Sequence, residues 1–138
     1  MTLLDAYALI AFIVGGPATA EVRGILREGG AAVATANLAE ALDVSARVYG
    51  LSIDQALEPL EPLFSGALDE IPLDGVRARR AATIRSSHYS RRDRPISLGD
   101  SILLASGSAG DRIATADHHV LEIAAIEGLE PVPLPSGG

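Results

Sequence analysis

Short apolar runs alternate with longer segments of helical periodicity along this chain of 138 residues, and this alternation limits the possible folds most strongly. A compact run such as residues 31–36 is typical of a strand that is buried on both faces of a sheet. Strands that are joined through helices form parallel sheets with right-handed crossovers. The sequence therefore predicts a three-layer α/β/α sandwich with a central, mainly parallel sheet of about five short strands.

Caps and helix breakers suggest where each element begins and ends. Asn37, for example, is an expected N-cap, and Glu40 three residues later could complete a capping box with it. We expect strands at residues 3–4, 31–36, 68–73, 112–115 and 130–134. We expect helices over residues 6–13, 17–29, 37–50, 52–64, 75–89, 97–107 and 118–127. Pro59 and Pro62 make the second half of the 52–64 helix uncertain, because interior prolines disrupt helices. These elements predict a single domain over residues 1–135, followed by a frayed tail at 136–138.

Composition excludes several classes of protein. The longest apolar run, residues 6–14, is about half of the roughly 20 residues that a helix needs to cross a bilayer. No basic residue precedes Arg23, which argues against a signal peptide. The chain has no cysteine, so it has neither disulfides nor thiolate metal ligands. We therefore expect a cytoplasmic protein that does not enter a membrane.

The basic residues are unevenly distributed. A net charge of −7 argues against electrostatic binding of nucleic acid over the whole surface. All the basic residues are arginines, however, and most of them fall in one short segment. Its members are Arg77, Arg79, Arg80, Arg85, Arg91, Arg92 and Arg94. The planar guanidinium suits phosphate because it donates two hydrogen bonds at once, although a solvated helix face followed by a polar loop explains the same pattern.

Four acidic residues lie at or near the start of an expected helix: Asp5, Glu40, Asp100 and Asp117. Strand carboxyl ends and helix amino ends meet at one edge of a parallel sheet, so the four carboxylates can converge there. A hard divalent cation such as Mg²⁺ or Mn²⁺ would relieve their repulsion. Each acid has an alternative role as a helix cap, which stabilises a protein by about 1 kcal/mol. The position of Asp5 and Asp117 after strands, and the apolar setting of Asp100, favour the metal site.

The acids stand within four motifs that occur in a characteristic order. The motifs are Leu3-Leu4-Asp5-Ala6, Asn37-Leu38-Ala39-Glu40-Ala41, Leu98-Gly99-Asp100-Ser101-Ile102-Leu103-Leu104-Ala105 and Ile113-Ala114-Thr115-Ala116-Asp117. With these motifs the chain resembles the PIN-domain ribonucleases, and within them the VapC-like toxins of bacterial toxin–antitoxin pairs. The resemblance covers nearly the whole chain. Tyr7 departs from the pattern, because a small hydroxyl residue is common at that position.

The resemblance implies a site and an activity. Asp5, Glu40, Asp100 and Asp117 would bind one or two Mg²⁺ or Mn²⁺ ions and carry catalysis, with Thr115 as a polar neighbour. The implied activity is Mg²⁺-dependent endonucleolytic cleavage of RNA by a homodimer that a small antitoxin neutralises.

The remaining expectations concern charged side chains outside the acid cluster. We assign contacts with the RNA backbone to part of the basic segment, namely Arg85, Arg91, Arg92 and Arg94. We expect the three histidines, His88, His118 and His119, to lie at the surface.

Two other functions fit a chain of this kind: a catalytically silent binding module with the PIN fold, and a PIN nuclease of RNA processing that is not a toxin. Two further classes of acid-cluster protein fit poorly. Phospho-accepting receiver domains and haloacid-dehalogenase-type phosphatases both require a lysine, and this chain has none. The phosphatases also require an Asp-x-Asp pair, and Tyr7 stands where the second aspartate would be.

Overall fold

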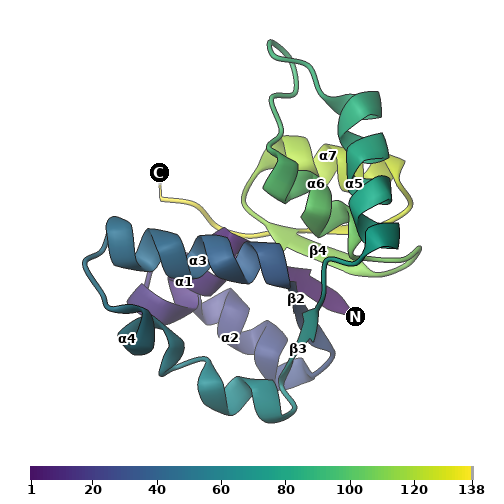
Figure 1. Cartoon of the computed structure of the whole chain (residues 1–138). Coiled ribbons are helices and arrows are strands. Elements are labelled where there is room, and N and C mark those ends of the chain that lie inside the picture. Colours follow the sequence, from purple (N-terminus) through teal and green to yellow (C-terminus); the bar gives the residue numbers. More distant parts are fainter. Residues whose placement is uncertain (138) are drawn as a thin grey trace.

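A five-stranded parallel sheet forms the centre of the molecule, with helices on both of its faces (Figure 1). The structure is a computed structural model that describes residues 1–137. The strands are β1 (Thr2–Leu4), β2 (Ala31–Ala34), β3 (Leu68–Ile71), β4 (Arg112–Thr115) and β5 (Glu130–Pro133). Their order is β3-β2-β1-β4-β5, and every neighbouring pair is parallel. The predicted three-layer fold is therefore confirmed.

Seven α-helices and one 3₁₀ helix fill the outer layers of residues 1–137. They are α1 (Ala6–Val14), α2 (Thr19–Glu28), α3 (Thr35–Arg47), α4 (Ile53–Leu57), η1 (Glu61–Ser65), α5 (Gly75–His88), α6 (Leu98–Ala105) and α7 (His118–Ile126). Within this part of the chain no single helix is long and apolar enough to cross a membrane; only α1 and α2 together, bent by 105°, pass that test.

Several predicted boundaries are wrong; the strand expected over residues 31–36, for example, ends at Ala34, and the helix expected over 37–50 ends at Arg47. The helix expected over 52–64 ends at Leu57 and is followed by η1, because Pro59 and Pro62 have no N–H to donate and crowd the preceding turn. Helix α2 begins at Thr19 rather than at Pro17. Helix α3 begins at Thr35 directly after β2, so Asn37 lies inside its first turn and is not its N-cap.

The two faces of the sheet bury two separate hydrophobic clusters. Leu3 packs in the cluster beneath α5, α6 and α7, whereas the next residue, Leu4, packs in the cluster beneath α1, α2 and α3. Ile113 and Ala114 of β4 divide in the same way. This alternation is the period-2 pattern of a strand that is covered on both faces.

The strand order places a crevice next to the central strand. From β1 the chain leads first to β2 on one side of β1, and it later reaches β4 on the other side. The carboxyl ends of β1 and β4 therefore form a topological switch point, where folds of this kind bind their ligands. Asp5 directly follows β1, and Asp117 lies two residues after β4. The fold thus brings the first and last predicted acids to the same edge.

Candidate functional site

A pocket of about 300 Å³ opens at this edge of the sheet. Its lining residues are Asp5, Ala6, Tyr7, Asn37, Glu40, Asp100, Ala116 and Asp117. The sequence predicts that four acids converge, and all four of them line this one pocket. They come from four different elements, so the tertiary fold rather than local sequence brings them together. Their role as metal ligands stays a prediction.

Asp5 is the N-cap of α1, and its side chain is half-buried. Its Oδ1 accepts a hydrogen bond from the backbone N–H of Ala8 at 2.8 Å. The pKa of the Asp5 carboxyl is raised from 3.8 to about 6, chiefly by burial and to a smaller extent by the nearby charges of Asp100 and Asp117, while hydrogen bonds from Thr115 and Ala8 act in the opposite direction. The pocket therefore penalises the negative charge of Asp5 unless a cation compensates it.

Asp100 and Asp117 also cap helices. Asp100 forms a capping box with Ser97 at the start of α6: its Oδ2 accepts from the Ser97 N–H, and its own N–H donates to Ser97 Oγ, both at 3.0 Å. Asp117 is the N-cap of α7 and accepts from the His119 N–H at 2.9 Å. Each cap uses one carboxylate oxygen. Within residues 1–137 the other oxygen of each carboxylate accepts no hydrogen bond, so capping and ligand binding are compatible.

Thr115 ends β4 beneath these carboxylates. It is buried, its Oγ1 accepts a hydrogen bond from the Asp117 N–H at 3.1 Å, and its hydroxyl lowers the pKa of the Asp5 carboxyl. Thr115 therefore lies next to both the first and the last acid of the pocket.

Glu40 lies on the exposed side of α3, and the buried side chain of Asn37 holds it. The Nδ2 of Asn37 donates to Glu40 Oε1 at 3.0 Å and to the carbonyl oxygen of Gly99 at 3.2 Å. The spacing of Asn37 and Glu40 suggested a capping box in the sequence. Because α3 begins earlier, the same spacing instead places the two side chains on one face of the helix, where they contact each other.

The pocket offers the kind of ligand atoms that a hard cation prefers, but these atoms are not already grouped around one metal position. Within residues 1–137 no three His, Asp or Glu side chains are arranged to hold one ion together. The ligand atoms that the pocket offers are oxygens, which suit Mg²⁺ or Mn²⁺. Mg²⁺ keeps several of its waters and needs only one or two protein carboxylates. The residues present therefore fit a hydrated ion, with some acids acting through water.

Three arginines of the basic segment on α5 contact other parts of the protein. Arg77 forms an ion pair with Asp74 at 2.8 Å, and Arg80 donates to the carbonyl oxygen of Gly107 at 2.6 Å. Arg85 donates through Nε to the carbonyl oxygen of Ile96, and its guanidinium lies 4.4 Å from the centre of the Tyr89 ring. The structure thus gives these three side chains intramolecular partners.

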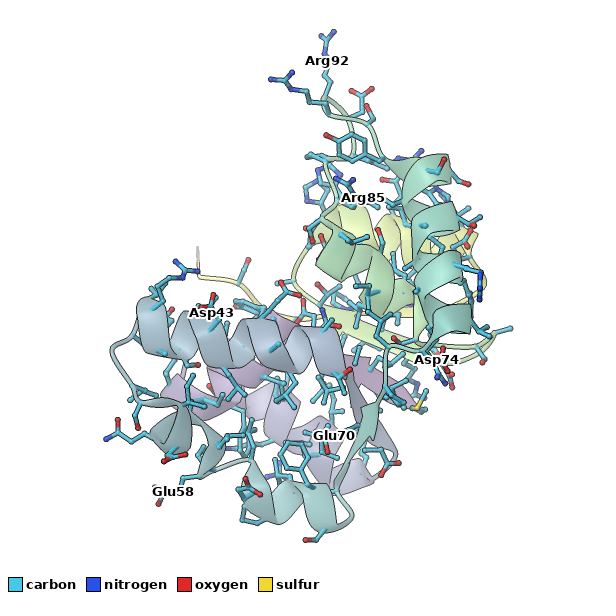
Figure 2. All side chains as sticks on the ribbon, in the orientation of Figure 1. Asp43, Glu58, Glu70, Asp74, Arg85 and Arg92 are labelled. Carbon is cyan, nitrogen blue, oxygen red and sulfur yellow. The ribbon has the colours of Figure 1, made fainter. Side chains whose placement is uncertain are left out.

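The loop between α5 and α6 carries the remaining arginines of the proposed RNA contact. Arg94 is half-buried and lies 3.9 Å from Glu122. Arg91 and Arg92 are exposed, and Figure 2 shows Arg92 at the tip of the loop, directed away from the helices. Among the four predicted contacts, Arg91 and Arg92 are therefore the ones most accessible to a ligand.

One of the three histidines that were predicted to lie at the surface is buried. His88 is buried at the end of α5, and its Nε2 lies 3.1 Å from Glu127 Oε2. Glu127 is distant from His88 in the sequence, so no local sequence pattern predicts that His88 is buried. His118 is exposed and His119 is partly exposed.

Solved structures with the same fold come from toxin–antitoxin systems. A DNA-bound VapBC complex from Salmonella typhimurium matches with a TM-score of 0.70 at 21% identity, covering 96% of each chain. A toxin–antitoxin complex from Klebsiella pneumoniae matches with a TM-score of 0.67 at 20% identity, covering 99% of this chain and 100% of that one. VapBC2 from Rickettsia felis, bound to a promoter DNA fragment, matches with a TM-score of 0.68 at 13% identity, covering 97% and 98%.

Sequence comparison alone finds no counterpart: no protein-family model and no curated protein matches the chain. At these low identities the structural matches establish the fold over nearly the full length of both chains. The likeness to PIN-domain, VapC-like proteins that the four motifs indicate is therefore confirmed for the fold, and the chain has a PIN-like α/β/α architecture.

Proposed function

We propose that this protein is a metal-dependent endoribonuclease that hydrolyses phosphodiester bonds in RNA, and that it is the toxin of a toxin–antitoxin pair. The observation that carries the proposal is the acidic pocket at the switch point, in which four carboxylates from four elements line about 300 Å³. A pocket whose charged side chains are all carboxylates suits phosphodiester chemistry assisted by Mg²⁺ or Mn²⁺.

The burial of each acid suggests its role. Asp5 and Asp100 are half-buried and would hold the ion. Glu40 and Asp117 are more exposed and would complete the site directly or through water. A bound Mg²⁺ or Mn²⁺ eases the ionisation of water and neutralises charge on the phosphate. Glu40, which accepts a hydrogen bond from Asn37, would orient the attacking water.

A second cavity suggests where the RNA strand continues. This cavity of about 350 Å³ is lined by Ala82, Arg85, Ser86, Tyr89 and Leu98. One of its lining residues, Leu98, begins helix α6, which also carries Asp100 of the acidic pocket. Arg85 uses only Nε for its backbone contact, which leaves its terminal amines for phosphate. Phosphate contacts from Arg85, Arg91, Arg92 and Arg94 would position the strand without reading its sequence.

The toxin assignment rests on the fold and on the surface. Three solved structures that share the fold are toxin–antitoxin complexes. Large apolar side chains are exposed where α3 leads into α4, at Val48, Tyr49 and Ile53. Exposed apolar groups of this kind are typical of protein–protein contacts, so we infer a small antitoxin as partner and a homodimer as the assembly.

Cleavage of RNA with and without Mg²⁺ tests the proposal. We expect cleavage that EDTA abolishes and that Asp100→Asn removes without unfolding the protein. Asp43→Asn is the matched control, because Asp43 is an exposed acid on α3 that pairs with Arg47 outside the pocket. Full activity of Asp100→Asn would refute the assignment of the site, and a stable, RNA-binding wild type without cleavage would favour the silent binding module.

A further inference from the structure

The buried amide of Asn37 makes contacts that a helix-forming role does not require. The side chain is only 2% exposed and lines the acidic pocket. Its two hydrogen bonds reach Glu40 Oε1 and the carbonyl oxygen of Gly99, and both of these atoms can only accept. The NH₂ end of the amide must therefore face them, which fixes the orientation of the side chain. Oδ1 is left buried, with no hydrogen-bond partner among residues 1–137.

Asn37 connects two helices that each carry an acid of the pocket. Glu40 belongs to α3, and Gly99 immediately precedes Asp100 on α6. The Glu40 carboxylate lies so close to Gly99 that an added Cβ would collide with Glu40 Oε1. One amide therefore bonds the Glu40 carboxylate and the backbone beside Asp100 at the same time, and the glycine leaves room for this approach.

The unpaired Oδ1, taken together with the two hydrogen bonds at the pocket, points to a role beyond packing. A buried carbonyl oxygen without a donor destabilises a fold, so an apolar side chain would serve the packing of α3 better. An asparagine is therefore expected at such a position when its NH₂ group orients a functional side chain. Residues that orient the ligands of a metal site typically act in this way.

We propose that Asn37 is a positioning residue that fixes the Glu40 carboxylate relative to Asp100. The consequence for metal binding and cleavage rests on the function proposed above, whereas the geometry of the contact does not. Because Asn37 acts through Glu40, its removal should weaken cation binding only while Glu40 is present.

A double-mutant cycle tests this dependence, with Mn²⁺ affinity measured by calorimetry. Asn37→Ala should weaken Mn²⁺ binding about tenfold, the lower end of the effect expected for residues that orient ligands. In a Glu40→Ala background the same change should have little further effect. Ser45→Ala is the matched control, because Ser45 is a buried residue of α3 whose Oγ also has no partner but which does not line the pocket. An equal loss in both backgrounds, or a loss of thermal stability alone, would overturn the proposal.

A metal-free measurement separates this proposal from the proposed function. By NMR, the Asn37 NH₂ protons should exchange slowly with solvent and should exchange faster in Glu40→Ala, where only the hydrogen bond to Gly99 remains, whereas the exposed amide of Gln55 should exchange fast in both proteins. Fast exchange of the Asn37 amide in the wild type would overturn the positioning contact. Slow exchange in a protein that binds no Mn²⁺ would support the contact and refute the metal-dependent function.

Discussion

The charge of Asp5 should make the metal-free protein less stable at neutral pH than at mildly acidic pH. Burial raises the pKa of Asp5 from 3.8 to about 6. Between these values the folded state binds a proton that the unfolded state has released, so stability falls as pH rises through this window. At 1.36 kcal/mol for each pKa unit, the full cost above pH 6 is about 3 kcal/mol. This cost is absent below pH 3.8, the pKa of Asp5 in the unfolded state.

Asp5→Asn removes this cost while keeping the cap, because an asparagine oxygen can also accept from the Ala8 N–H. In EDTA, the variant should be more stable than the wild type by up to about 3 kcal/mol above pH 7. The difference should shrink towards zero near pH 4. Urea unfolding followed by circular dichroism at both pH values measures it, with Asp43→Asn as an exposed-acid control. A difference that does not change with pH, or a variant less stable above pH 7, would refute the electrostatic reasoning.

Three further outcomes follow from the site and the basic loop. Gly99→Ala should displace the Glu40 carboxylate and lower the rate of cleavage about tenfold. The loss of stability should be small, because the group that the new Cβ meets is the end of a flexible side chain. Activity assays and thermal melts check these two expectations. Replacing Arg91 and Arg92 with Ala should reduce the salt slope of RNA binding by about 1.4, measured in Ca²⁺, and an unchanged slope would point to a protein contact instead. Induced expression should stop growth and Asp100→Asn should relieve the arrest; unchanged growth with confirmed expression would favour a nuclease that is not a toxin.

Local sequence predicts most of this fold because local forces set most of its elements. Ser52 and Ser97 begin helices through capping boxes, and Asp74 caps α5, as short-range spacing indicates. The acids were found because each follows a strand or begins a helix, and a parallel sheet sends all such positions to one edge.

Two of the errors arise because contacts between distant parts of the chain determine the structure. Asn37 seemed to be a cap because the spacing to Glu40 fits one, but its true partners include Gly99 on another helix. His88 is buried because Glu127 provides a partner from the other end of the sequence. Neither contact has a periodicity or a turn signal, so only the assembled structure reveals it.

The position of β1 in the sheet has a consequence for the order of folding. This strand is the first to be synthesised, yet its two neighbours are β2 and the much later β4. A chain that has grown only as far as α6 already carries Asp5, Glu40 and Asp100, but the central strand is still an open edge. Closing that edge requires a contact across most of the sequence, which forms late and slowly. Asp117 lies two residues after β4, so the pocket is completed only after β4 has joined the sheet.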